Sequence, residues 1–365
     1  MSPLQRFQGW DSQPSRSLVI DEATLHRNIT QMQARAGGAE LRPHIKTHKS
    51  ALIARMQAKA GATGFTVALA EEALMLLEAG LGPVTLARPE LDPVRLAALM
   101  PHAATGKLRF VVDCEAHLQA LAEQAPSRVE VLIKVDVGLH RLGIVPDAAV
   151  LIALAAQIKP PLVLVGILSH AGHGYGAQSH QALAEIAEAE RALMVALAKT
   201  LPQISVVSVG ATPTLLAGQS LEGITEIRPG NYALLDLTAV GLGVAKRSDI
   251  ALAVVARVLS VTADRVVIDV GSKVLSSDRG AHGTASVAGF GELWLQGAER
   301  GLTLQRLSEE HGVTEAPLGL AVKVGQLGLV LPNHSCPVMN LGGAFTLLPS
   351  GERHRLGPTS SDILR

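Results

Sequence analysis

Two lysines and two histidines lie close together near the start of this 365-residue sequence, in residues 42–49, which read RPHIKTHK. The segment follows a Gly-Gly break and stands where a short strand should end. A lysine amine held in a dry pocket loses its charge readily and becomes a nucleophile toward carbonyl compounds. The alternative is an ordinary basic strand end whose charges are solvated. Other motifs must decide between these two interpretations.

Two further segments place polar residues directly after apolar runs that are typical of buried strands. Residues 136–143, DVGLHRLG, contain Arg141, and residues 169–176, SHAGHGYG, contain His170, His173 and Tyr175. Histidine is the side chain best suited to proton transfer near neutral pH. A glycine turn with a surface arginine and structural histidines is the alternative.

A phosphate-binding segment is predicted at residues 208–214, SVGATPT, which include Ser208, Gly210 and Thr212. Small residues and hydroxyls between a strand and a helix present backbone N–H groups and the positive end of the helix dipole. The same residue types also form ordinary turns.

A metal-binding pair is predicted near the C-terminus, where His334 and Cys336 form a His-x-Cys motif. Sulfur together with imidazole favours Zn²⁺, and two protein ligands leave positions open for water or substrate. Such a pair also occurs by chance, and an inert buried cysteine is the alternative.

The elements that must position these residues alternate between strands and helices up to about residue 240. Several strands are near-continuous apolar runs, which is typical of parallel strands covered on both faces. Eight such units predict a (β/α)8 barrel, in which functional groups follow the strands at the C-terminal face; a doubly wound sheet is the alternative. The expected strands are 41–45, 64–67, 84–87, 109–112, 129–135, 162–168, 204–209 and 232–237, and the expected helices include 70–79, 93–100, 115–124, 147–157 and 179–201.

The alternation of strands and helices ends after about Val240. Residues 250–261 and 265–270 predict adjacent strands, and we expect a β-rich second domain to begin near residue 246. Lys+Arg and Asp+Glu both number 32, which gives no indication of a nucleic-acid partner. Two cysteines predict no disulfide framework, no apolar run is long enough for a membrane span, and no signal peptide is apparent. We therefore expect a cytoplasmic protein with no membrane partner.

Together, in order and spacing, these motifs resemble those of the D-serine dehydratase and D-threonine aldolase family, which has the alanine-racemase-like fold and uses pyridoxal 5'-phosphate (PLP). The resemblance implies that Lys46 forms the Schiff base with PLP and that Arg141 lies beside the phenolic oxygen of the cofactor. It also implies a homodimer with a PLP-binding barrel at residues 22–245 and a metal-carrying β-rich domain formed by 1–21 with 246–365. The implied cofactor contacts are His44, Lys46, Arg141, His170, Tyr175, Ser208, Gly210, Thr212, Asn231 and Tyr232.

By the same resemblance, His334 and Cys336 hold a divalent metal, with Zn²⁺ favoured over Mn²⁺ or Mg²⁺. The dehydratases carry His-x-Cys and the D-threonine aldolases carry His-x-Asp, so Cys336 favours a dehydratase of β-hydroxy D-amino acids that converts D-serine to a keto acid and ammonia. The aldolase alternative stays open, because His173 stands in the sequence context of the base that starts retro-aldol cleavage to glycine and an aldehyde. A 3-hydroxy-D-aspartate aldolase or dehydratase is also compatible. A PLP-homeostasis protein without turnover and an amino-acid racemase are the other two alternatives.

Overall fold

The computed structural model of the chain describes residues 2–284 and 287–357, and it consists of two compact units. The barrel unit comprises Thr30–Gly174 and Gln181–Gly230, with Gly357. The β-rich unit comprises the N-terminal residues up to Ile29, Tyr175–His180 and Asn231–Leu356. Each unit is built around its own sheet.

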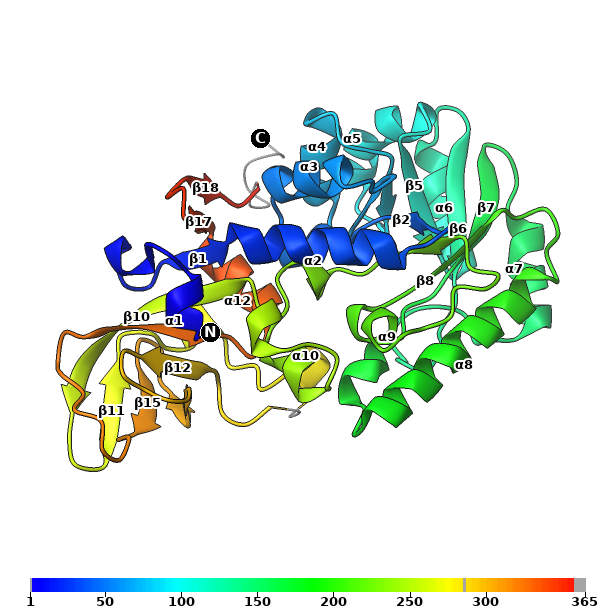
Figure 1. Cartoon of the computed structure of the whole chain (residues 1–365). Helices are drawn as coiled ribbons and strands as arrows, with labels where there is room; N and C mark the ends of the chain where they lie inside the picture. The colour runs from blue at the N-terminus through cyan, green and yellow to red at the C-terminus, as the bar shows by residue number, and fades with distance from the viewer. Residues whose placement is uncertain (1, 285–286, 358–365) are drawn as a thin grey trace. The chain divides into compact units, whose positions relative to one another are not determined.

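The barrel unit is formed by a parallel sheet that has eight strands within the described residues (Figure 1). Neighbouring strands follow the order β2-β9-β8-β7-β6-β5-β4-β3, and the two edges meet through a parallel bridge between His44 and Thr66, where the Thr66 N–H donates to the Pro43 carbonyl oxygen at 2.9 Å. The predicted barrel is confirmed, and the doubly wound alternative is not observed. The strands are β2 Glu40–Leu41, β3 Phe65–Val67, β4 Val84–Leu86, β5 Leu108–Val112, β6 Val129–Lys134, β7 Leu162–Leu168, β8 Val206–Val209 and β9 Glu226–Ile227.

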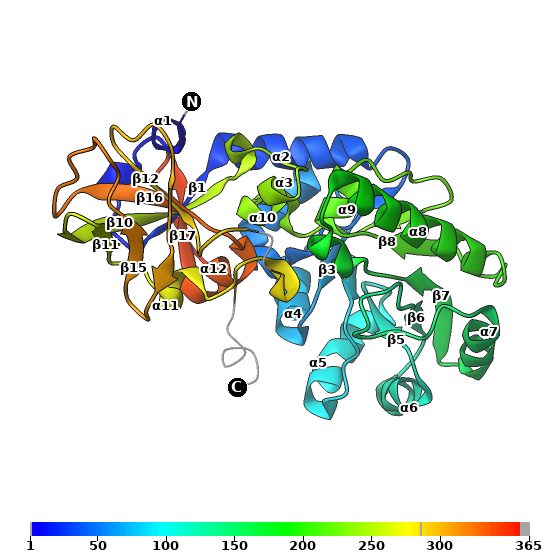
Figure 2. The ribbon, with the colours of Figure 1, turned by 90° about the horizontal axis from the view of Figure 1, so that it is seen from below.

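Helices cover the outside of these strands (Figures 1 and 2). Short polar side chains begin several of them: the Ser50 hydroxyl accepts from the Ile53 N–H, and the Asp92 and Asp147 carboxylates accept from two backbone N–H groups each. The helices are α2 Glu22–Arg35, α3 Ala51–Lys59, α4 Ala70–Glu78, α5 Pro93–Ala104, α6 Glu115–Gln124, α7 Ala148–Gln157, α8 His180–Ala198 and α9 Thr212–Leu216, and the short 3-10 segments of this region are η2 Ile45–Thr47 and η3 Gly172–Gly176.

The eighth barrel strand lies earlier than the sequence predicts. Residues 232–237 were expected to form it, but the strand is β9, Glu226–Ile227, which pairs with β2 and β8. The expected segment instead forms η4, Asn231–Ala233, and then begins α10, Leu237–Gly241, with Asp236 as its N-cap. Both alternatives bury an apolar run of this length, and periodicity alone does not separate them.

The β-rich unit contains a mixed sheet in which the N-terminal strand β1 pairs antiparallel with β10 and parallel with β17. Its core includes Phe7, Val19, Trp294 and Leu331, all buried. No helix in the described part of the chain is both long and apolar enough to cross a membrane. The strands are β1 Leu18–Asp21, β10 Leu252–Val261, β11 Arg265–Ile268, β12 Glu292–Leu295, β13 Leu302–Thr303, β14 Arg306–Leu307, β15 Gly312–Glu315, β16 Leu327–Leu331, β17 Ala344–Leu348 and β18 Arg353–Arg355, and the remaining helical segments are α1 Pro3–Arg6, η1 Trp10–Ser12, η5 Arg247–Asp249, α11 Ser272–Leu275, η6 Ala281–Gly283 and α12 Ser335–Gly342.

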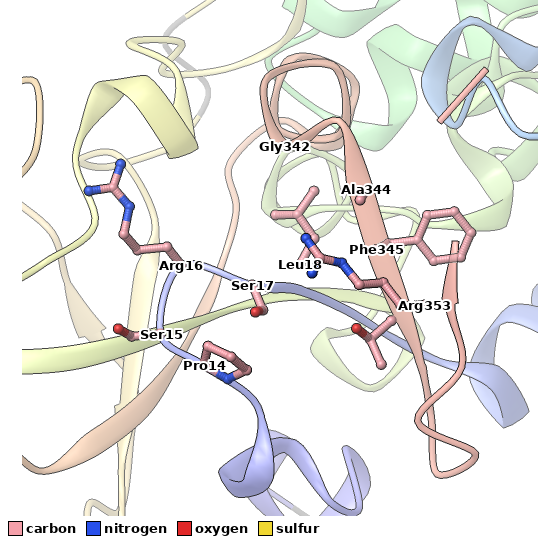
Figure 3. Close-up of a pocket in the computed structure, with 10 residues that line it drawn as sticks. Pro14, Ser15, Arg16, Ser17, Leu18, Gly342, Ala344, Phe345 and Arg353 are labelled. Atoms are coloured by element: carbon pink, nitrogen blue, oxygen red, sulfur yellow. The ribbon is translucent and has the colours of Figure 1, made fainter. Parts of the chain in front are cut away.

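A pocket of about 250 Å³ lies beside β1 and β17 and is lined by Leu18, Phe345 and Arg353 among others. Its two arginines do not converge, since the guanidinium group of Arg16 points away from Arg353 (Figure 3). Arg16 instead pairs with Glu310 at 2.6 Å. This pocket is therefore a surface hollow without a focused set of polar groups.

Candidate active site

Lys46 lies in η2, five residues beyond the end of β2, at the face of the barrel where the strands end. The side chain of His44 holds the Lys46 backbone, because His44 Nδ1 accepts the Lys46 N–H at 3.4 Å. Burial, together with the nearby charges of Lys46 and His170, holds the pKa of His44 well below its ordinary value of 6.5. His44 is therefore neutral at physiological pH, and the structure brings the three predicted residues His44, Lys46 and His170 together.

Two cations that the sequence analysis did not single out lie in the same region. Lys134 ends β6 and donates its Nζ–H to the Ala87 carbonyl oxygen at 2.8 Å. Burial, and then the charges of Arg228 and Arg141, lower the pKa of Lys134 to about 7. Burial also lowers the pKa of Arg228 to about 10. Positive groups thus gather around Lys46, which suits an anionic ligand.

Arg228 is anchored by neighbouring strands. Its guanidinium group donates to the Ser208 hydroxyl oxygen at 2.5 Å and to the Ser169 carbonyl oxygen. The Ser208 hydroxyl in turn donates to Glu226, a buried carboxylate. Residues 226 and 228 stand two apart on an extended segment, so both side chains point to the same side, here the barrel interior.

Glu226 is the carboxylate beneath these cations. It pairs with Arg42 at 2.9 Å and with Arg109. Burial raises the pKa of Glu226, but the charges of Arg109, Arg42 and Arg228 outweigh that effect and lower it. One buried carboxylate therefore faces the guanidinium groups of Arg42, Arg109 and Arg228, and the interior keeps an excess of positive charge.

The predicted phosphate segment connects β8 to α9. Gly210 has φ +124°, and a Cβ there would lie 3.2 Å from the backbone nitrogen of Arg228, so the tight turn requires glycine. Thr212 is buried, and its Oγ1 has no hydrogen-bond partner among the described residues. The Gly210 carbonyl oxygen lies 3.1 Å from His170 Nδ1. The turn thus presents an unsatisfied hydroxyl beside the cationic groups.

Glu190, a buried residue of α8, joins the two loops that carry these residues and was missed from the sequence. Its Oε1 accepts from the Ser169 hydroxyl at 2.8 Å and from the Ala171 N–H at 3.1 Å, and the Gly210 N–H lies 3.5 Å from the same oxygen. A glutamate in an amphipathic helix is ordinarily exposed, and only its interruption of the apolar face signals a buried role.

His173 lies in η3, in the loop after β7, and packs against the loop that carries Arg141. A Cβ on Gly138 would lie 3.2 Å from the His173 ring, so the absence of a side chain there permits the close approach. Burial lowers the pKa of His173 below 6.5, which keeps the ring neutral near pH 7. Its Nδ1 is buried and has no partner within the described part of the chain. Arg141 itself is exposed.

The other predicted cofactor contacts belong to the β-rich unit. Tyr175 is buried, with its ring centroid 5.2 Å from that of His282. Asn231 donates its Nδ2–H to Asp236 at 2.7 Å, and Tyr232 is buried in the same turn. The predicted cofactor contacts are therefore divided between the two units. Lys46 belongs to the barrel unit, and the predicted metal ligands belong to the β-rich unit.

His334 and Cys336 lie at the start of α12, where His334 is the N-cap residue. The Cys336 thiol is hydrogen-bonded to His334, and Asp278 Oδ2 lies 2.8 Å from His334 Nδ1. Burial acts to lower the pKa of His334, but Cys336, Asp236 and Asp278 raise it to about 9. The structure thus brings the predicted pair together in surroundings that stabilise a positive charge.

Asp236 fixes the backbone of this pair. The buried carboxylate accepts from the Ser335 N–H at 3.0 Å and from the Ala239 N–H at 3.2 Å, which ties the start of α12 to the start of α10. Burial raises the pKa of Asp236. Neither Asp236 nor Asp278 had a sequence signal, because each lies far from residue 334 in the chain.

The fold and the two clusters define a class: a parallel barrel with a buried, cation-rich mouth, joined to a β-rich unit that carries a histidine–cysteine pair. Comparison with known families agrees, since residues 20–236 match the alanine racemase N-terminal domain and residues 251–348 match the family described as "Putative serine dehydratase domain". The chain belongs to the alanine racemase N-terminal domain family, in the branch that carries the dehydratase domain.

Individual relatives narrow this further. The chain is 36% identical to D-threo-3-hydroxyaspartate dehydratase of Delftia sp., over 87% of this chain and 90% of that protein, and 30% identical to D-threonine aldolase of Arthrobacter sp., over 92% and 89%. The solved structure of the Delftia dehydratase aligns with 96% of this chain over 98% of its own chain, at 33% sequence identity and a TM-score of 0.86. The predicted membership in the group of β-hydroxy D-amino acid dehydratases and aldolases is confirmed.

Proposed function

We propose that this protein is a PLP- and metal-dependent lyase of β-hydroxy D-amino acids that releases a keto acid and ammonia. The observation that carries the proposal is the position of Lys46 at the C-terminal face of the barrel, among buried cations. Relatives named as dehydratases and aldolases of such substrates support it.

The barrel residues fit PLP. Its phosphate needs hydrogen-bond donors and positive charge, and the Gly210 turn with the buried hydroxyl of Thr212 offers the donors. Arg228 and Lys134 supply positive charge. Lys46 would hold the aldehyde end of the cofactor, with Arg141 near its phenolic oxygen. His44, His170, Tyr175, Ser208, Asn231 and Tyr232 complete the proposed set of contacts.

When bound, PLP supplies an electron sink for the charge that develops at Cα. The residues of the chain then move the protons. Lys46 would take the proton from Cα of the substrate, because an amine among positive charges is readily neutral. His173, neutral near pH 7, would instead take a proton from a substrate hydroxyl.

The residues at the start of α12 fit a divalent metal. His334 and Cys336 provide imidazole and sulfur, a donor set that favours Zn²⁺ over Mn²⁺ or Mg²⁺. Asp278 on Nδ1 would orient the imidazole, as carboxylates do behind metal-bound histidines. A bound metal would supply a Lewis acid that eases departure of the β-hydroxyl. A solved mutant of D-threo-3-hydroxyaspartate dehydratase, described as the metal-free form, supports this assignment.

The choice between elimination and retro-aldol cleavage depends on which proton is removed. Cys336 supports elimination, because the family resemblance associates His-x-Cys with dehydratases. The aldolase is the second candidate. The observation that favours it is the buried Nδ1 of His173, which has no hydrogen-bond partner among the described residues and could accept the proton of the substrate hydroxyl.

One assay tests the proposal. Purified protein with PLP receives D-serine, D-threonine or D-threo-3-hydroxyaspartate, with and without a chelator, and keto acid and ammonia are scored against glycine. We expect keto acid with at least one substrate, and loss of turnover with the chelator. Glycine as the main product would establish the aldolase, and no product from any substrate would overturn the lyase.

We further infer a cytoplasmic homodimer in which residues 22–245 bind PLP and residues 1–21 with 246–365 carry the metal. The family resemblance supports the dimer, and the matches to residues 20–236 and 251–348 support the two parts. Light scattering coupled to gel filtration gives the mass in solution, and a monomeric mass would contradict the dimer.

A further inference from the structure

A second cluster of metal-ligating side chains lies in the barrel unit, far along the chain from His334 and Cys336. It consists of Asp113, Cys114 and His117, a D-C-x-x-H sequence. One ligand atom of each side chain, a carboxylate oxygen, a sulfur and an imidazole nitrogen, lies within 4.8 Å of the other two. The proposed reaction uses none of them.

The local fold explains why these side chains meet. β5 ends at Val112, Cys114 is the N-cap of α6, and His117 lies in the first turn of that helix. Residues three apart on a helix share a face, so the imidazole returns toward the thiol and the preceding carboxylate. Asp113 Oδ1 lies 2.8 Å from His117 Nδ1.

The other oxygen of Asp113 has a separate role. Asp113 Oδ2 accepts the Gly143 N–H at 2.8 Å, which holds the end of the loop that carries Arg141. The carboxylate is therefore positioned by backbone, with one oxygen directed at His117. Cys114 is exposed, while Asp113 and His117 are half-buried, so the cluster opens to solvent on the thiol side.

We propose that Asp113, Cys114 and His117 bind a thiophilic divalent cation, Zn²⁺ in the first instance, as a second metal site. Zinc bonds of about 2.0–2.3 Å in tetrahedral geometry place ligand atoms about 3.3–3.8 Å apart. Atoms already within 4.8 Å of one another reach that spacing with movements on the order of 1 Å. Water fills the fourth position from the open side. Sulfur, nitrogen and oxygen donors together select zinc over magnesium or calcium.

The test separates the two sites by substitution. Each protein, with PLP bound, is stripped by a chelator and titrated with Zn²⁺ against a chromogenic competitor. We expect about two equivalents per chain in the wild type, one in the double variant His334→Ala/Cys336→Ala, and none when Cys114→Ser and His117→Gln are added to it. His26→Gln is the matched control, because His26 is an exposed helical histidine that also contacts a carboxylate, Glu22 at 3.5 Å, but belongs to no cluster of metal-ligating side chains within residues 2–284 and 287–357. It should leave the number of equivalents unchanged.

Cobalt gives an independent readout. In the His334→Ala/Cys336→Ala background, Co²⁺ bound through Cys114 should show near-ultraviolet sulfur-to-cobalt absorption, and Cys114→Ser should remove it while circular dichroism stays native. The proposal is wrong if that background binds no Zn²⁺, or if Cys114→Ser with His117→Gln leaves the number of equivalents unchanged. A wild type that binds one equivalent, lost with Cys114→Ser and His117→Gln but kept in His334→Ala/Cys336→Ala, would refute the His334 metal assignment and leave this site standing.

Discussion

The barrel mouth and the start of α12 are opposites in charge. Around Lys46 the buried or partly buried groups are mainly cations, including Lys134 and Arg228, with Glu226 and Glu190 as the carboxylates that act on Arg228. Around His334 they are acidic: Cys336, Asp236 and Asp278. A region with excess positive charge binds anions, and one with excess carboxylate and thiol binds cations. Each cluster is thus stabilised by the ligand type that the other would repel.

The same physical cause acts with opposite sign in the two regions. Burial disfavours the charged form of any group, so it lowers the pKa of Lys134 and raises that of Asp236. Both shifts show that charge is held in these regions at a cost in free energy, which a ligand of opposite charge would relieve. The following predictions test that comparison.

The largest effect is expected for Lys46→Ala. The substitution removes the amine proposed to hold PLP, so the visible absorbance of the bound cofactor and all turnover should be lost. Lys59→Ala, at an exposed lysine that ends α3, is the control and should keep both. Retention of the absorbance by Lys46→Ala, or borohydride labelling of another peptide, would refute the assignment.

Cys336→Ala should abolish turnover while leaving PLP bound, because it removes one proposed metal ligand in the β-rich unit and no barrel group. Metal analysis, cofactor absorbance and keto-acid release are measured on the same preparation. If activity survives this substitution, or survives metal stripping, the Lewis-acid role is excluded. Val338→Ala, at a buried position two residues further along α12, controls for packing and should retain turnover.

The titration of Lys134 should be visible in stability. Its pKa is about 7 in the folded chain and about 10.5 when unfolded, so the unfolded chain binds more protons between those values. In that window the unfolding free energy of the cofactor-free protein should rise with pH, relative to Lys134→Met, by on the order of 5 kcal/mol in total. Below about pH 7 the difference should be flat.

Denaturant titrations across this pH range measure the effect. Bound PLP should weaken it, because an anion near Lys134 restores the charged form and raises the pKa. Parallel curves for the wild type and Lys134→Met at every pH would contradict the charge argument for the barrel mouth.

Asp278→Asn should weaken metal binding by about 10- to 100-fold, since the residue orients the His334 imidazole. PLP affinity should not change. Zn²⁺ competition in the Cys114→Ser/His117→Gln background isolates this site. Unchanged affinity would assign Asp278 a structural role only.

Thr212→Val should have the smallest effect, a loss of PLP affinity of about tenfold, which is the lower end of what one hydrogen bond to a charged group contributes. The cofactor-free fold should not be destabilised, because the buried Thr212 hydroxyl has no partner among the described residues. Thr214→Val should do the reverse, since its hydroxyl bonds the Ala211 backbone. Equal stability losses in both variants would refute the assignment of Thr212 to the proposed phosphate site.

Much of the fold was predictable because local patterns carry it. The boundaries of α6, Glu115–Gln124, agree with the sequence pattern, and Asp147 begins α7 as a helix N-cap should. The eighth strand was misplaced because an apolar run is compatible with a buried turn and helix. Strand pairing, such as β1 between β10 and β17, depends on contacts more than 200 residues apart in the chain, and no local signal reports it.

Residue types alone identified which groups could do chemistry, because a lysine between histidines and a His-x-Cys pair carry their reactivity within a few residues of chain. Only the tertiary structure decided the charge around them. Lys134, Arg228, Glu190, Asp236 and Asp278 come from separate strands, helices and loops. Burial shifts the pKa values of Lys134, Arg228 and Asp236, and hydrogen bonds formed only in the folded chain give Glu190 and Asp278 their roles. Electrostatic environment is a property of the folded surroundings, which the neighbouring sequence does not encode.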